Sequence, residues 1–107
     1  MEDNTGTIKS WSVSDRPREK LLEKGIAALT DSELLAILLR SGTKQESAVD
    51  LAKRLFKSAD YNLASLSKLS VKEMSRFKGI GKVKAITIVA ALELGRRRAE
   101  SQIIEKR

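Results

Sequence analysis

The sequence predicts an all-α fold, a compact bundle of five to six helices. Three observations support this class. Apolar residues recur at helical spacing, Ser and Thr stand at N-cap positions in front of those stretches, and one Pro with six Gly supplies too few turn residues for a many-stranded sheet. The apolar residues make up 41% of the chain and only 4% are aromatic, a composition that suits packed helices. A chain of 107 residues is expected to form one core.

Three segments are expected along the chain. Residues 1–10 show no period and are interpreted as a flexible N-terminal segment, and residues 11–98 as the folded domain. Residues 99–107 alternate in charge and carry no helix stop signal, so a frayed tail or a linker is expected there.

The first predicted helix has Pro17 in its first turn, where a missing N–H costs little, and ends at Gly25. Its expected N-cap is Ser14 or Asp15. Its two Leu residues are expected to face the core; they are Leu21 and Leu22.

Two further helices follow. Thr30 and Glu33 have the spacing of a capping box, which predicts a buried helix through Leu39 that ends near Gly42. The third helix is predicted by an apolar stripe at helical spacing, made of Ala48, Leu51, Ala52, Leu55 and Phe56.

The second half of the chain predicts three more helices. A short one carries Leu residues spaced by three (Leu63, Leu66 and Leu69), and Ser70 caps the next, two-turn helix. The last runs from Lys82 to about Arg98 and is expected to be largely covered by the others. Residues 69–74 repeat the pattern of 29–34, which indicates two helical hairpins. The expected buried residues are Leu34, Leu38, Leu51, Leu55, Phe77, Ile86 and Val89.

The composition excludes many kinds of site. Without His or Cys, thiolate and imidazole metal ligands and His-based nucleophile systems are absent, so we expect no catalytic residue, no metal and no cofactor. An enzyme using a lysine Schiff base would need a Lys buried in a cleft. No apolar stretch reaches the length of a signal or membrane segment, which predicts a cytoplasmic protein without a membrane partner.

The net charge of +7 favours a polyanionic partner, because clustered Lys and Arg displace counterions from phosphates. Charge that only keeps the protein soluble is the alternative.

The candidate binding site is the turn before the last helix. Its residues are Lys78, Gly79, Ile80, Gly81, Lys82, Val83 and Lys84. The two glycines let the backbone approach a partner, the unpaired amides of the next helix face the same point, and three lysines surround it. Ile80 is expected to plug the hairpin. The alternative is that the glycines serve only as a helix C-cap and a turn.

Each of three other groups of polar residues has a functional interpretation and a simpler structural one. Arg16, Arg18 and Lys20 near Trp11 could form a second basic contact, or a solvated helix face. The run 96–98 of three arginines could extend the binding face or complement the helix dipole. Glu33 and Glu73 stand at capping positions, which favours a structural role over a carboxylate pair.

The turn with its two helices resembles the helix-hairpin-helix motif, and its doubling resembles the paired form of many DNA repair proteins. Five stretches narrow this to a resemblance to the N-terminal region of the RadC family, running from about Ile8 to Arg98. They are 16–21, 29–36, 39–43, 79–81 and 93–97. The first turn has a single glycine and extra residues, so this copy of the motif is degenerate.

The resemblance implies DNA binding by an N-terminal domain. The family's second part, a metalloprotease-like domain of the JAB type with a His-x-His and Asp zinc signature, has no counterpart here, so no hydrolase activity is carried over. Helix-hairpin-helix turns elsewhere sometimes hold a monovalent cation on their carbonyls, which the resemblance permits at Gly79 and Gly81.

Two functions remain in competition. The first is sequence-tolerant, non-catalytic binding of nucleic acid, DNA before RNA, because amides and lysines contact phosphates and no helix offers base-reading side chains. The second is a protein-interaction module that docks a protein partner or a missing catalytic domain. The preferred strand form and the oligomeric state stay open.

Overall fold

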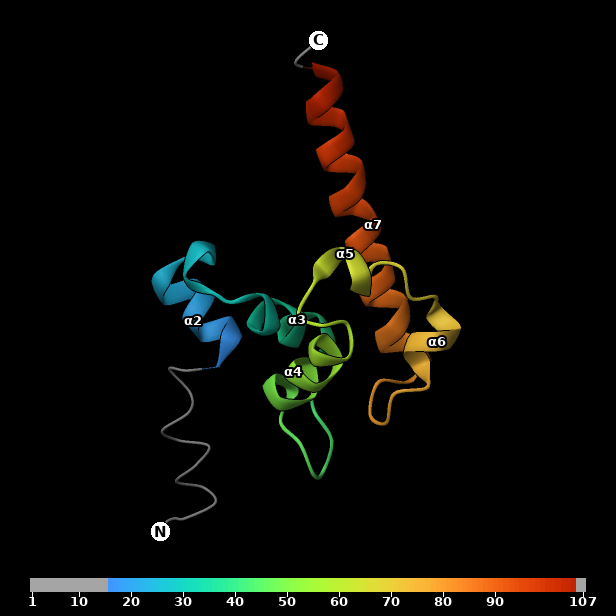
Figure 1. Ribbon diagram of the computed structural model, residues 1–107. Helices are drawn as coiled ribbons and strands as arrows, with labels where there is room; N and C mark the ends of the chain where they lie inside the picture. Colours follow the sequence, from blue (N-terminus) through green and yellow to red (C-terminus); the bar gives the residue numbers. More distant parts are fainter. Residues whose placement is uncertain (1–15, 106–107) are drawn as a thin grey trace.

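The computed structural model describes residues 16–105, and this part of the chain consists of helices joined by turns and loops, without strands (Figure 1). The predicted all-α class is therefore confirmed. The elements are α2 (Pro17–Lys24), the 3-10 helix η1 (Ile26–Ala28), α3 (Asp31–Leu39), α4 (Ala48–Ser58), α5 (Leu63–Leu66), α6 (Val71–Ser75) and α7 (Gly81–Glu105). The predicted flexible segment 1–10 and the side chain of Trp11 lie outside the described residues.

Helix α2 differs from its prediction at its start and on its exposed face. Its N-cap is Arg16, which makes no side-chain capping bond, and the expected caps Ser14 and Asp15 lie outside the described residues. Pro17 fixes the backbone of the first turn instead, and Gly25, with φ of 89°, ends the helix as predicted. Leu22 is 82% exposed rather than directed into the core, because α2 packs on the domain with its other side.

Side-chain caps define where the central helices begin. Both predicted capping boxes are present: Thr30 and Glu33 start α3, and Ser70 and Glu73 start α6. The backbone N–H of each cap residue donates to the paired glutamate, which lowers the pKa of Glu33 and of Glu73. The Oγ of Ser47 accepts from the backbone N of Asp50 and caps α4 in a similar way.

The core lies where α3, α4 and the first half of α7 meet. Its fully buried large side chains are Leu39, Leu51, Leu55, Leu66, Met74, Ile80 and Ile88. Of the residues predicted to be buried, Leu51 and Leu55 are confirmed, and four are only partly buried: Leu34, Leu38, Phe77 and Val89.

Ile86 is 49% exposed, so its predicted burial is wrong. Helix α7 turns a different face inward, with Ala85 and Ile88 fully buried. The sequence of this helix has apolar residues on several sides. Their periodicity alone does not decide which of them face the neighbouring helices.

Helix α7 continues to Glu105, beyond the predicted end near Arg98, and its second half projects away from the other helices (Figure 1). Leu94 is 69% exposed there, so the expectation that the helix is largely covered is wrong. Neither Gly nor Pro follows Arg98, and ion pairs one turn apart, such as Arg97 with Glu93, support the helix. The boundary of the domain at residue 98 stays a prediction.

None of the helices in residues 16–105 is long and apolar enough to cross a bilayer.

Candidate nucleic-acid interface

Two turns lie next to each other at the same end of the molecule (Figure 1). The first turn, residues 40–47, joins α3 to α4, and the second turn, residues 76–80, joins α6 to α7. Each turn connects two helices that pack against one another. The turns touch at Gly79, where a Cβ would lie 2.9 Å from Cγ2 of Thr43.

The backbone of the second turn takes a shape that its glycines permit. Gly79 and Gly81 have φ of 93° and 63°, in the region that L side chains rarely adopt. Ile80 between them is fully buried, which confirms its predicted position as the plug of the hairpin. Gly81 then begins α7, whose first amides have no acceptor inside the helix.

Gly81 faces open space. No described atom lies within 4 Å of the position that a Cβ would take there. Val83, two residues on, is 77% exposed, which is unusual for an apolar side chain at the start of a packed helix. The backbone at the start of α7 is therefore accessible from outside.

The three predicted lysines have different surroundings. Lys78 and Lys82 are exposed beside the turn. Lys84 is half-buried, and its Nζ donates to the carbonyl of Ser41 at 2.8 Å and more weakly to that of Gly79 at 3.5 Å. Lys84 thus joins the start of α7 to the first turn, a structural role that its position in the sequence does not indicate.

Arg54 is a second bridge between the turns and was not found from the sequence. Its Nε and Nη2 donate to the carboxylate of Glu46 at 3.0 and 2.9 Å, and Nη2 also donates to the carbonyl of Lys78. The guanidinium hydrogen bond lowers the pKa of Glu46, and Glu46 in turn raises that of Arg54. The bridge joins residues far apart in the sequence, so no local pattern could have indicated it.

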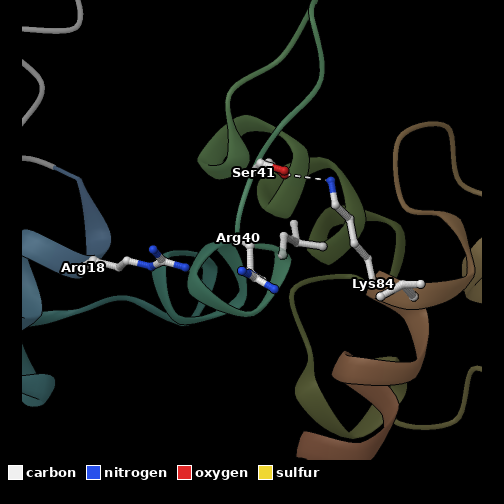
Figure 2. Close-up of a pocket in the computed structure, with 6 residues that line it drawn as sticks. Arg18, Arg40, Ser41 and Lys84 are labelled. Atoms are coloured by element: carbon white, nitrogen blue, oxygen red, sulfur yellow. Dashed lines mark hydrogen bonds between the residues drawn. The ribbon is translucent and has the colours of Figure 1, made fainter.

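A basic hollow lies between α2, the end of α3 with the first residues of the first turn, and the start of α7 (Figure 2). Its volume is about 410 Å³, and it is lined by Arg18, Leu39, Arg40, Ser41, Val83 and Lys84. Two predicted site residues, Val83 and Lys84, belong to this hollow. Arg18 lines the same hollow from the opposite side, and no local sequence pattern connects it with Lys84 (Figure 2).

The other basic residues singled out from the sequence are partly neutralised. Lys20 pairs with Glu33 at 3.1 Å. Arg96 and Arg97 both bond the carboxylate of Glu93, which lowers the pKa of that carboxyl to about 2. These arginines lie on the projecting part of α7, away from the two turns (Figure 1).

An apolar hollow of about 190 Å³ lies on another face, among α3, α5 and α7. It is lined by Asp31, Leu34, Leu35, Leu38, Leu63, Ala91 and Leu92. Within residues 16–105 no group of three Asp or Glu side chains is placed to hold a metal ion.

Comparison with known proteins identifies the family. Residues 8–86 match the family model described as UPF0758 N-terminal. A UPF0758 protein of Flavobacterium johnsoniae is 54% identical over 105 residues, which cover 98% of this chain and 45% of that protein. The UPF0758 protein YsxA of Bacillus subtilis is 52% identical over 90 residues, covering 84% of this chain and 38% of that protein.

The chain spans less than half the length of these curated relatives. No solved structure matches it significantly. The family model covers most of the described helices, from before α2 to the start of α7, and therefore includes both turns. On this match, the chain belongs to the UPF0758 N-terminal family.

Proposed function

We propose that the chain binds nucleic acid, DNA in the first place, through the second turn and the start of α7, and that it does so without catalysis. The observation that carries this proposal is the open space in front of Gly81, next to the exposed side chains of Lys78 and Lys82. Positive φ at two glycines brings backbone amides to the surface at a helix N-terminus, where a phosphate oxygen finds several donors.

Such contacts do not depend on the base sequence. Amides and lysines bind phosphate oxygens, which are alike at every nucleotide, so the domain would fix its position on a strand without reading bases. The resemblance of the turn to the helix-hairpin-helix motif, and of the chain to the N-terminal region of the RadC family, agrees with this function. The relatives' printed names state no activity.

The test is the salt dependence of DNA affinity, measured by fluorescence anisotropy with a labelled duplex. One small domain is expected to bind in the range of about 10⁻⁴ to 10⁻⁶ M near physiological salt. With about three to five phosphates neutralised, the slope of log K against log salt should be about −3 to −4.5. Lys82→Ala should flatten this slope by roughly one unit.

The matched control is Lys57→Ala. Lys57 is also an exposed lysine, but it lies in the last turn of α4, outside the second turn and the start of α7. Its loss removes the same charge and should leave the slope nearly unchanged. Equal effects of the two substitutions would show that only the net charge matters, and would overturn the assignment to the turn.

A second candidate function is docking of protein, favoured by the apolar hollow among α3, α5 and α7. The chain spans less than half of its relatives, so the natural occupant would be the remaining part of such a longer protein. Leu38→Glu and Leu63→Glu in the longer protein should then increase the protease sensitivity of the joint between the two parts. Unchanged cleavage rates would remove this candidate.

A further inference from the structure

The basic hollow is walled by cations from three separate elements. Arg18 comes from α2, Arg40 follows α3, and Lys84 comes from the first turn of α7; none of the described lining residues is acidic. Figure 2 shows Arg18 extending from α2 toward α3, and Lys84 reaching across to Ser41. Like charges repel, so a folded chain gathers them most readily where an anion can be bound between them.

Arg40 is held in a conformation that an arginine rarely adopts. Its φ is 70° and its ψ is −41°, and the N–H of Ser41 donates to the carbonyl of Leu39 at 2.8 Å. This is a γ-turn with positive φ, which is strained for a residue that has a Cβ. Glycine would adopt the same turn without that strain.

The backbone of Arg40 ends α3, because its N–H donates to the carbonyls of Ala36 and Ile37, but glycine could do the same and the arginine side chain has no such role. Within residues 16–105 its guanidinium makes no hydrogen bond or ion pair that would stabilise the fold, whereas Arg54 and Lys84 nearby each bridge two segments. Strained residues that persist without a structural contact are typical of binding sites. An arginine at this place therefore indicates a ligand that needs its guanidinium.

The size of the hollow indicates more than a bare ion. Its volume of about 410 Å³ leaves room for a sugar or base beside a phosphate. The exposed Val83 supplies apolar surface for that part of the ligand, and the guanidinium groups offer paired N–H donors to phosphate oxygens.

We propose that the basic hollow binds a nucleotide phosphate, with Arg18 and Arg40 as the ligands of the phosphate group and Lys84 as a third cation at its edge. The identification of this phosphate as part of the nucleic acid bound by the second turn rests on the function proposed above. Val83 and Lys84 connect the two places, because they stand on the first turn of α7, directly after Gly81 and Lys82.

The first experiment uses no DNA. The full 107-residue chain is titrated with thymidine 5′-monophosphate and, separately, with thymidine, and backbone amide signals are followed by NMR. The monophosphate should shift the amides of Arg40, Ser41 and Val83, and thymidine should not. Shifts spread evenly over the surface, or identical for both compounds, would overturn the proposal.

A double variant removes both guanidinium groups from the hollow. Arg18→Gln with Arg40→Gln should weaken binding of the monophosphate about tenfold. The matched control, Lys53→Gln with Lys57→Gln, removes the same charge from exposed positions on α4 and should change affinity less than twofold. Equal losses in both proteins would overturn the proposal.

Arg40→Gly separates binding from folding. Because glycine relieves the strained turn, this variant should raise the thermal midpoint by about 5 °C and still bind the monophosphate more weakly than the parent. A variant that is stabilised and binds as tightly as the parent would show that Arg40 is not a ligand.

A second experiment compares two duplexes that differ only in a 5′-phosphate or a 5′-hydroxyl at the ends. If the Arg18 and Arg40 double variant loses affinity for both, the hollow takes an internal phosphate; if it loses affinity only for the phosphorylated duplex, the hollow takes a strand end. If neither affinity changes while Lys82→Ala still weakens binding, the hollow is not part of the DNA interface and the function proposed for the second turn stands.

The opposite failure is also distinct. If the parent protein binds no DNA but binds the monophosphate through Arg18 and Arg40, the hollow stands as a nucleotide phosphate site, and the function proposed for the second turn fails.

Discussion

The two turns of the molecule each contain glycine, but for opposite reasons. A Cβ on Gly42 in the first turn would lie 2.0 Å from the carbonyl oxygen of Glu46 and 2.5 Å from the carbonyl carbon of Ser47. A Cβ on Gly81, after the second turn, would meet no described atom within 4 Å. The first turn is thus closed by its own backbone, whereas the backbone that leads from the second turn into α7 is open at Gly81.

This difference separates a structural turn from a candidate binding turn. In the first turn the hydroxyl of Thr43 accepts from the N–H groups of Gln45 and Glu46, so the loop satisfies its own donors. After the second turn the backbone of Gly81 is exposed, with Lys78 and Lys82 beside it, whereas within that turn the carbonyls of Lys78 and Gly79 accept from Arg54 and Lys84. A glycine in a turn indicates a binding site only when the space in front of it is empty.

The largest expected effect is that of Gly42→Ala. Backbone atoms cannot yield as flexible side chains do, so the substitution should lower the free energy of unfolding by about 3 kcal/mol or more, measured by urea denaturation. Gly95→Ala in exposed helix α7 is the control and should stabilise by roughly 0.5 to 1 kcal/mol. A Gly42→Ala protein as stable as the parent would refute the description of the first turn.

Gly81→Val should have a smaller effect on stability and a large one on binding. Positive φ costs about 1 to 2 kcal/mol for a residue with a Cβ, but nothing crowds the new side chain, so the protein should remain folded and helical by circular dichroism. Its DNA affinity should fall at least about tenfold, because the side chain stands where the backbone would meet a phosphate. If the DNA affinity and the salt slope stay those of the parent, the second turn has only a structural role and does not contact DNA.

Arg54→Met tests the bridge between the turns. Removing the guanidinium leaves Glu46 without its partner and the carbonyl of Lys78 without a donor, and should lower the thermal midpoint by about 1 to 5 °C. In a double-mutant cycle with Glu46→Gln the two losses should not add. Additive losses would show that the pair is not coupled.

The smallest expected effect is on the pH dependence of stability. The pKa values of Glu33, Glu46 and Glu73 are lowered in the folded protein from the ordinary 4.5. A carboxyl with a lowered pKa binds fewer protons when folded, so its stabilisation is present above about pH 4.5 and is lost as the pH falls through the folded value. As the pH is lowered below about 4.5, the thermal midpoint should decrease. The decrease should be less steep in Glu46→Gln. Identical profiles of thermal midpoint against pH in the two proteins would contradict the role given to Glu46.

The sequence predicted the helices well, because the signals that set their ends are local. Thr30 with Glu33 and Ser70 with Glu73 form both capping boxes as expected, and Gly25 ends α2. The same locality explains the errors. Whether Leu22 or Ile86 faces the core depends on which side of a helix meets its neighbours, and periodicity alone does not fix that.

The candidate site was predicted in part. Its glycines and lysines are adjacent in the sequence and could be recognised together. Arg54 in α4 holds the second turn, and Arg40 after the end of α3 lines the basic hollow; both reach the site only through tertiary packing. The two bonds of Lys84 with backbone carbonyls show that a lysine beside a glycine turn can also act as a structural bridge.

The second turn and the start of α7, and not the closed loop 43–46 of the first turn, are proposed to meet the nucleic acid. The most direct measurement is an NMR titration of the isotope-labelled chain with a short duplex, following the backbone amides one by one. The largest shifts should fall on residues 79–84 and their intensity should fade as salt is added, while the amides of Gln45 and Glu46 in the first turn move little. Shifts centred on the apolar hollow around Leu38 and Leu63, or none at all, would contradict the claim.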